Sequence, residues 1–201
     1  MADVSTRERI LEEAMRLFAE RGFRGTSVAE IESAAGLSAG SGALYHHFSS
    51  KDAVLSAGVA RHLARLDALR DIRKVFAGVG DLRTQLAVTA RYYLAELDSQ
   101  ADLLRLVVAE GRRKQDLLST ATHELVALTY ESFTEWLEEA TGHDLPAERA
   151  RAATTIGMGA LLASRLTRDV LGANPLDVDD ELLVTTWTDM MFGLLDTRPE
   201  G

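Results

Sequence analysis

Apolar residues recur every three or four positions along most of the chain, which is the spacing of helices that bury one face. The first such stripe consists of Ile10, Ala14, Leu17 and Phe18. Glycine-rich and proline-bearing breaks separate the stripes, as at residues 78–80 and 172–175. No stretch shows the alternation of apolar and polar residues that is typical of a strand. The pattern therefore predicts an all-α protein of about nine helices.

Residues 26–55 predict two short helices joined by a tight turn, followed by the start of a longer helix. Ser27 and Glu30 fit a capping box, in which each side chain bonds an unpaired backbone N–H of the first helical turn. Gly36 can adopt the left-handed conformation that ends this helix, and a second helix is expected over residues 44–48. Two helices in this order form a helix-turn-helix, whose second helix lies in the major groove of DNA.

Capping boxes also predict where the neighbouring helices begin. Ser5 with Glu8 fits one at the start of the first helix, and Ser49 with Asp52 fits one at the start of the third. The apolar spacing of this third helix continues through Leu55, Val59, Leu63, Leu66, Leu69 and Ile72. A helix of this length spans roughly 30 Å, enough to connect the N-terminal helices with a distant body.

The N-terminal helices carry the marks of a known family. The matching residues are Ile10, Ala14, Phe18, Gly22-Phe23, Thr26-Ser27-Val28, Ile31, Ala34-Ala35-Gly36-Leu37-Ser38, Leu44-Tyr45-His46-His47-Phe48 and Ser50-Lys51. In these residues the chain resembles the DNA-binding domain of the TetR family of ligand-responsive transcription regulators, over about a quarter of its length. The resemblance implies a three-helix helix-turn-helix domain over residues 1–50 and a helical effector-binding and dimerisation domain over residues 51–201.

The resemblance also implies which side chains contact DNA. The expected set is Thr26, Ser27, Ser38, Ser41, Ala43, Tyr45, His46, His47 and Lys51. Tyr45, His47 and Lys51 match positions that contact phosphates in the family. Hydroxyls at the N-terminus of a helix can cap the helix and also meet a phosphate, with help from the helix dipole. The alternative for Tyr45 is an ordinary place in the core, although either Leu44 or Phe48 beside it must already face inward.

The turn before Tyr45 departs from the family pattern. Ser38 and Tyr45 are separated by seven positions, whereas the family usually has five. The positions that would read bases hold Ser41, Gly42 and Ala43, and none of these can make a bidentate bond to a base. We therefore expect sequence specificity to depend on Tyr45, His46 and DNA shape.

Charge limits how strongly such a surface would bind DNA. The chain has a net charge of −9, and residues 1–60 hold six Lys or Arg against eight Asp or Glu, a net charge of −2. The cationic residues expected near phosphates are Arg7, Arg9, Arg24, His46, His47 and Lys51. Because affinity scales with the number of phosphates neutralised, we expect modest non-specific binding, through one end of the molecule only.

Composition sets the broad class. The chain has 201 residues, of which 46% are apolar, so it can form one large domain or two small ones with a core. It has no cysteine, which excludes disulfides and thiolate metal sites. No signal peptide and no apolar run near the ~18 residues of a membrane span are visible. We therefore expect a soluble, cytoplasmic protein that does not associate with membranes.

Aromatic and sulfur-bearing residues of the second domain suggest an effector cavity. The candidates are Tyr92, Tyr93, Phe133, Trp136 and Met158. They belong to three predicted helices that the family packs around an apolar pocket for a small-molecule effector. For any one of them an ordinary place in the core is the favoured alternative, and only as a group do they indicate a pocket. Arg91 or Arg112 could orient an acidic effector, but the sequence does not decide this.

Small residues in the last two long helices suggest close packing. The candidates for a dimer interface are Gly157, Ala160, Trp187, Met190 and Leu194. They could pack internally, or the two helices could pair across a twofold axis as a four-helix bundle. The resemblance favours a homodimer, since two heads about 34–36 Å apart are needed to bind two half-sites of an inverted repeat.

Catalytic and metal-binding motifs are absent from the sequence. There is no nucleophile elbow, phosphate-cradling glycine loop or HExxH motif, so we expect no enzyme and no cofactor. His46 and His47 are adjacent and would point roughly 100° apart on a helix, so we expect no metal site there. The sequence thus predicts a DNA-binding transcription regulator, in the simplest case a repressor released from an inverted-repeat operator by an effector. The alternatives are an activator, or a helical adaptor that binds a partner protein without responding to an effector.

Overall fold

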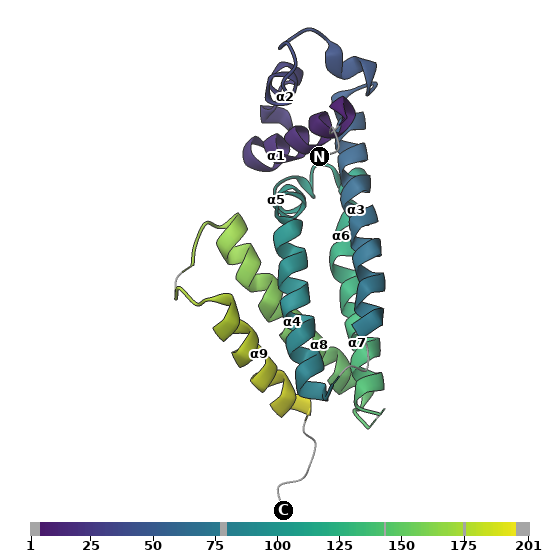
Figure 1. The fold of residues 1–201 in the computed structure, drawn as a ribbon, viewed down its shortest axis with the longest axis vertical. Coiled ribbons are helices and arrows are strands. Elements are labelled where there is room, and N and C mark those ends of the chain that lie inside the picture. The colour runs from purple at the N-terminus through teal and green to yellow at the C-terminus, as the bar shows by residue number, and fades with distance from the viewer. Residues whose placement is uncertain (1–4, 77–79, 143, 175, 196–201) are drawn as a thin grey trace, which may run out of the picture. The chain divides into compact units, whose positions relative to one another are not determined.

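The computed structural model describes residues 5–76, 80–142, 144–174 and 176–195, and this part of the chain is all-α, with nine α-helices and no strand. The predicted fold class is therefore confirmed (Figure 1). The α-helices are α1 (Thr6–Gly25), α2 (Val28–Ala34), α3 (Lys51–Phe76), α4 (Leu82–Ser99), α5 (Ala101–Glu110), α6 (Gln115–Thr122), α7 (Leu128–Ala140), α8 (Ala147–Arg165) and α9 (Asp180–Leu195). A short 3₁₀ helix, η1 (Ala43–His46), follows α2, and two π-helical turns, η2 (His123–Ala127) and η3 (Leu166–Val170), adjoin α7 and α8. None of the described helices is both long and apolar enough to span a bilayer.

The chain forms two compact units. Unit 1 combines Met1–Arg65 with Gln100–His123, and unit 2 combines Leu66–Ser99 with Glu124–Gly201. The compact units do not follow the predicted division between residues 50 and 51, because α5 and α6 join the N-terminal helices. That division concerns function and stays a prediction.

Unit 1 is built on the packing of α1 against α5 (Figure 1). The buried stripe of α1 includes the four predicted residues Ile10, Ala14, Leu17 and Phe18, all at most 3% exposed. Gly22 interrupts α1 with a left-handed φ of 76°, and the N–H of Phe23 donates to the buried Glu110 Oε1 of α5 over 3.3 Å. A segment distant in sequence thus forms part of the support for the helix-turn-helix.

Of the three predicted capping boxes, one is complete and one shows the Ser cap alone. Ser27 and Glu30 form the complete box at α2, and at α1 the Ser5 hydroxyl accepts the N–H of Glu8 over 3.2 Å. The third is wrong by one residue, because α3 begins at Lys51 and the cap is Ser50, whose hydroxyl accepts the N–H of Ala53. The predicted apolar stripe of α3 beyond Ala64 and the predicted break at 78–79 lie outside the described residues.

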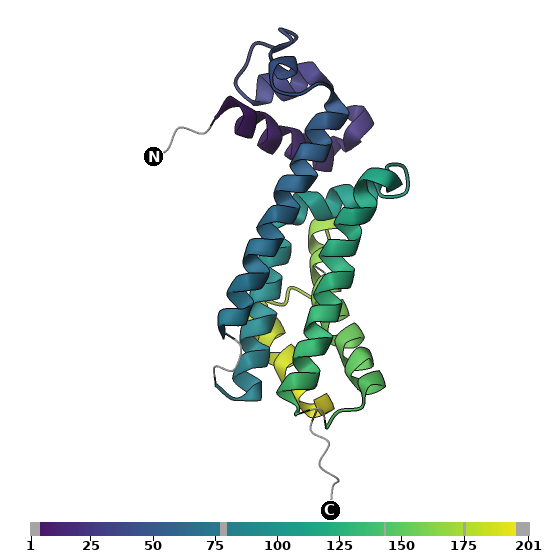
Figure 2. The same ribbon diagram turned by 90° about the vertical axis from the view of Figure 1, so that its right-hand side faces the viewer.

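Unit 2 has its core between α4, α7, α8 and α9, which Figures 1 and 2 show side by side. Its largest buried side chains include Leu86, Tyr93, Phe133, Leu161, Trp187 and Met191. Aromatic rings join α7 to α9 in this core. The ring centroid of Phe133 on α7 lies 5.2 Å from that of Trp136 on the same helix and 6.2 Å from that of Trp187 on α9. These apolar contacts hold α4 and α7 on opposite sides of α8, where the cavity described below is found.

Candidate nucleic-acid interface and ligand cavity

The segment after α2 is a tight turn that leads into η1 rather than into an α-helix. The predicted second helix over residues 44–48 is therefore wrong in type and length, because regular 3₁₀ structure covers only Ala43–His46. Gly40 and Gly42 lie in this turn with φ of 71° and 76°, which L side chains rarely adopt. The two glycines thus supply the left-handed conformations of the turn, and η1 begins directly after Gly42.

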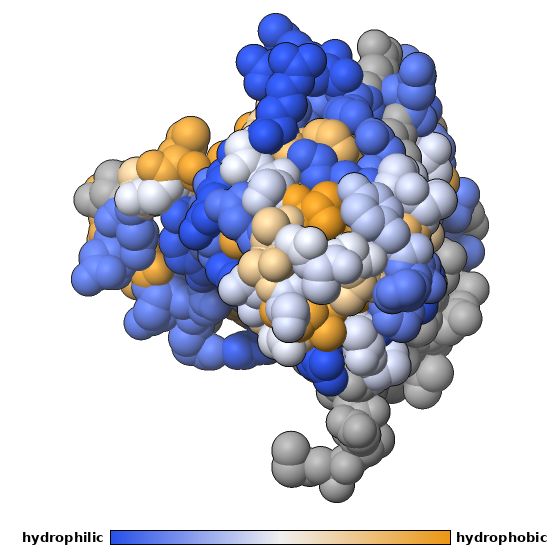
Figure 3. Space-filling model, turned by 90° about the horizontal axis from the view of Figure 1, so that it is seen from above, coloured by the Kyte–Doolittle hydropathy of each residue, from blue (hydrophilic) through white to orange (hydrophobic). Residues whose placement is uncertain are grey.

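The side chains after this turn divide into buried anchors and exposed polar groups. We call residues 43–48 the recognition segment. Leu44 and Phe48 are buried, whereas Tyr45 is 57% exposed and both His46 and His47 are exposed. Figure 3 looks onto this end of unit 1, where weakly polar and some hydrophobic side chains lie at the centre and hydrophilic ones lie around most of the edge. The alternative in which Tyr45 belongs to the core is thereby excluded for this structure.

The small predicted contact residues lie on the same loop. Ser38 and Ser41 are exposed in the turn that precedes η1, and Ala43, the first residue of η1, is half-buried. Ser27 is also exposed at the start of α2, where its hydroxyl and N–H both bond Glu30. These bonds from Ser27 are the main reason that the pKa of Glu30 lies below its usual value.

Two of the predicted contact residues point inward. The Thr26 side chain is 1% exposed, and its hydroxyl lies 3.1 Å from the carbonyl of Leu17, so it is not placed to contact a phosphate. The ammonium group of Lys51 donates to the carbonyls of Phe23 and Thr26 over 2.7 and 2.8 Å. Since an ammonium has three N–H donors, one remains for a phosphate.

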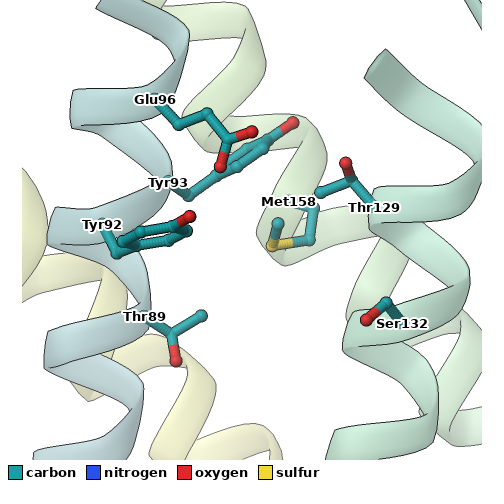
Figure 4. Close-up of a pocket in the computed structure, with 7 residues that line it drawn as sticks. All are labelled: Thr89, Tyr92, Tyr93, Glu96, Thr129, Ser132 and Met158. Carbon is teal, nitrogen blue, oxygen red and sulfur yellow. The ribbon is translucent and has the colours of Figure 1, made fainter. Parts of the chain in front are cut away.

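A small cavity lies between α4, α7 and α8 in unit 2 (Figure 4). Its lining residues are Thr89, Tyr92, Tyr93, Glu96, Thr129, Ser132 and Met158. Three of the five predicted pocket residues are among them, whereas Phe133 and Trp136 belong to the neighbouring core. Thr89, Thr129, Ser132 and Glu96 were missed, because short hydroxyl and acidic side chains on helices are common and carry no periodic signal.

The cavity is small, and most of its lining surface is apolar. Its volume is about 20 Å³, which is room for about one water molecule. Tyr93 is 4% exposed, and its hydroxyl has no hydrogen-bond partner among the described residues. Burial raises the pKa of this phenol well above its usual value. The suggested cation Arg91 does not line this cavity and instead pairs with Glu181 of α9.

The predicted dimer residues separate into an internal and an exposed group. Gly157 and Trp187 are buried against each other, so for them the internal alternative holds. Ala160 and Met190 are exposed and Leu194 is half-buried. Ile156 and Leu182, which were not among the predicted residues, are 53% and 56% exposed on the same two helices.

A helix-turn-helix with an exposed polar recognition segment, together with an all-α unit that encloses a cavity, defines the class of helix-turn-helix regulators. Residues 10–57 match the family model described as bacterial regulatory proteins, tetR family. This segment of the chain therefore carries a tetR-family DNA-binding domain. Its relatives are named as transcription regulators rather than as enzymes.

Similarity to curated relatives is highest in the N-terminal region. The transcriptional repressor AcnR of Corynebacterium efficiens is 45% identical over 67 residues, which cover 33% of this chain and 32% of AcnR. The transcriptional regulator UidR of Escherichia coli is 30% identical over 126 residues, which cover 62% of this chain and 61% of UidR. The chain thus spans between a third and three fifths of these relatives.

Similarity of fold extends over nearly the whole chain. A crystal structure of a TetR-family transcriptional regulator from Mesorhizobium loti superposes with a TM-score of 0.72 and covers 94% of this chain and 95% of that chain. The two are 20% identical in sequence, so this likeness concerns the fold. The likeness of fold therefore includes helices that follow the helix-turn-helix in the chain.

Proposed function

We propose that the protein is a homodimeric transcription regulator that binds an inverted-repeat operator and is released from it by a small-molecule effector. The observation that carries this proposal is that Tyr45, His46 and His47 are exposed directly after the turn of the helix-turn-helix. They lie within a segment that matches the tetR family. Repression is the simplest mode, and it agrees with the name of the matched relative AcnR.

On DNA, phosphate contacts would come mainly from Ser27, Tyr45, His47 and the remaining N–H of Lys51. Such contacts position the protein on the duplex without specifying its sequence. The small side chains of Ser41 and Ala43 would let the recognition segment approach the bases closely, so specificity would come from Tyr45, His46 and groove shape. Substitution Tyr45→Phe should leave folding unchanged and weaken binding by about fivefold to tenfold, the worth of about one hydrogen bond.

Dimerisation would use the exposed apolar face of α8 and α9. Ile156 and Ala160 on α8 and Leu182 and Met190 on α9 form apolar surface that lacks a partner within the described part of this chain. A second copy with the same face would bury it through a symmetric contact. The spacing of the two recognition segments would then set the half-site separation at about one helical turn of DNA.

The effector would bind in the cavity of unit 2. With space for about one water molecule, the cavity must widen between α4 and α7 to admit a larger compound. An effector that binds the widened form better shifts the population toward it, and only this difference in affinity can do so. By reciprocity, operator DNA would weaken effector binding by the same factor.

Selection of genomic fragments by the purified protein, at stated salt, tests the proposal. We expect recovery of one inverted repeat whose half-sites are separated by about one helical turn. The Tyr45→Phe variant should recover the same sequence more weakly. Recovery of no fragment above background by the wild-type protein would contradict the proposal.

A further inference from the structure

A buried carboxylate joins the two sides of the helix-turn-helix turn. Glu32 lies on α2 and is 0% exposed, although glutamate is rarely found fully inside a protein without pairing. One oxygen of its side chain, Oε2, has no hydrogen-bond partner among the described residues. Burying a carboxylate with an unsatisfied oxygen costs stability, so packing alone does not account for this residue.

The backbone carbonyl of Glu32 takes part in the hydrogen bonds that close the C-terminal end of α2. This carbonyl accepts the N–H of Leu37 over 2.8 Å, and the carbonyl of Ser33 accepts the N–H of Gly36 over 3.1 Å. With Gly36 at a φ of 74°, these two bonds form a Schellman motif. The α2 side of the turn is therefore closed by main-chain bonds that do not involve the Glu32 side chain.

The side chain of Glu32 caps the N-terminal end of η1. Its Oε1 accepts the buried N–H of Leu44 over 3.0 Å, across twelve positions of sequence. The first N–H groups of a helix have no partner within the helix, and a side chain at the preceding position usually caps them. That preceding position is Gly42, which has no side chain, so Glu32 supplies the cap from another helix.

The neighbouring donors of η1 are satisfied locally. Ala43 N–H donates to the hydroxyl of Ser41 over 3.3 Å, and Tyr45 N–H donates to the carbonyl of Gly42 over 3.0 Å. Leu44 N–H is the first-turn donor that depends on a residue outside the turn. A four-residue 3₁₀ helix has few bonds of its own, so this one bond contributes much of its attachment to α2.

We propose that Glu32 is a positioning residue for DNA recognition. It fixes the recognition segment to α2, so that Tyr45 and the two histidines after it face the solvent in one defined register. The inference rests on the proposed function, since the segment is held in place for binding DNA. The turn between α2 and η1 contains two left-handed glycines, Gly40 and Gly42, and the bond from Leu44 to Glu32 joins its two sides directly.

Amide hydrogen exchange tests the attachment without DNA. In Glu32→Met, which keeps the side-chain length and removes the acceptor, the Leu44 amide should exchange about tenfold faster or more, because its partner is lost. The Leu37 amide, bonded to the backbone carbonyl of the same residue, should keep its protection. Glu32→Gln retains an acceptor oxygen and should restore the protection of Leu44. The matched control is Ser33→Ala, an exposed neighbour on α2 that should leave both amides unchanged.

DNA binding tests the role. With the fragment that the wild-type protein selects, Glu32→Met should bind about tenfold more weakly, equivalent to about 1.4 kcal/mol, and Glu32→Gln should bind nearly normally. The inference is overturned if Leu44 stays protected in Glu32→Met, if Leu37 and Leu44 lose protection together, or if Leu44 is freed and DNA affinity is unchanged. Failure of the wild-type protein to select any DNA would contradict the proposed function, and Leu44 exchange would still decide whether Glu32 holds the turn.

Discussion

The indole N–H of Trp187 donates to the main-chain carbonyl of Gly157 over 2.7 Å, inside the contact between α9 and α8. Trp187 is 2% exposed, so this bond satisfies a polar group that would otherwise be buried without a partner. The indole can reach the backbone of α8 because residue 157 has no side chain. The close approach that the glycine permits is therefore internal to unit 2.

Gly157→Ala should destabilise the protein. An added Cβ would lie 2.5 Å from the Sδ of the buried Met191 and 3.3 Å from Cζ2 of Trp187, so the core must shift. Overpacking of this kind costs about 1–3 kcal/mol, which outweighs the gain of up to about 1 kcal/mol from alanine in a helix. Urea unfolding measures the difference. The control is Gly159→Ala on the same helix, whose Cβ would meet only the Tyr130 hydroxyl at 3.6 Å. Equal stability of the two variants would contradict the close contact.

The sequence predicted features that local chemistry determines. The capping residues Ser5 and Ser27 could be identified because a cap and its partner lie three positions apart. The buried stripe of α1 followed from helical spacing. Packing against a distant segment is not visible in such patterns. The placement of α5 beside α1, and with it the bond between Glu110 and Phe23, therefore required the structure.

The prediction of the functional residues was limited because the sequence does not show whether a side chain points to solvent or into the core. A matched motif position gives the residue type at that position but not whether the side chain turns outward. Thr26 was expected to contact a phosphate from the N-terminus of a helix, and its hydroxyl instead bonds the carbonyl of Leu17 in α1. Gly157 and Met190 were both predicted to lie in a dimer interface. Only the structure shows that Gly157 is buried within unit 2 and that Met190 is exposed. Glu32 carried no sequence signal, because its partner Leu44 is reached only through the shape of the turn.

Lys51→Met should lower stability as well as DNA affinity. The Lys51 ammonium bonds two main-chain carbonyls and lies 4.3 Å from the centroid of the Phe23 ring. Hydrogen bonds from charged groups contribute about 1.5–3 kcal/mol, so a loss of about 2 kcal/mol in the free energy of unfolding is expected. Lys114→Met is the control, since Lys114 also lies over Phe23 but pairs only with the exposed Asp52, a contact worth about 1 kcal/mol or less. If the two variants were equally stable, the inward bonds of Lys51 would not persist in solution.

Tyr93→Phe should stabilise the protein in the absence of any effector. The hydroxyl of Tyr93 is buried without a partner among the described residues, and removal of such a group is expected to raise the free energy of unfolding by about 1 kcal/mol. Tyr130→Phe, on the partly buried Tyr130, should change it by less than about 0.5 kcal/mol. Both are measured by urea unfolding at neutral pH. A loss of stability in Tyr93→Phe would mean that a water molecule in the cavity already satisfies the hydroxyl.

Asp180→Asn should make stability less dependent on pH in the acid range. The buried Arg165 donates to both carboxylate oxygens of Asp180, over 2.8 and 2.7 Å, and these bonds hold the pKa of Asp180 below its usual value. Because the folded-state pKa is the lower one, the stabilisation is fully present above the unfolded-state value of about 3.9 and is lost as the pH falls through the folded-state value. Since the Asp180 side chain is 55% exposed, its contribution at pH 7 should be about 1 kcal/mol or less. Urea unfolding at pH 7, and then at steps below pH 4, should therefore show the wild-type advantage shrinking as the pH falls. A constant difference between the two proteins across this range would show that ionisation of Asp180 does not contribute through Arg165.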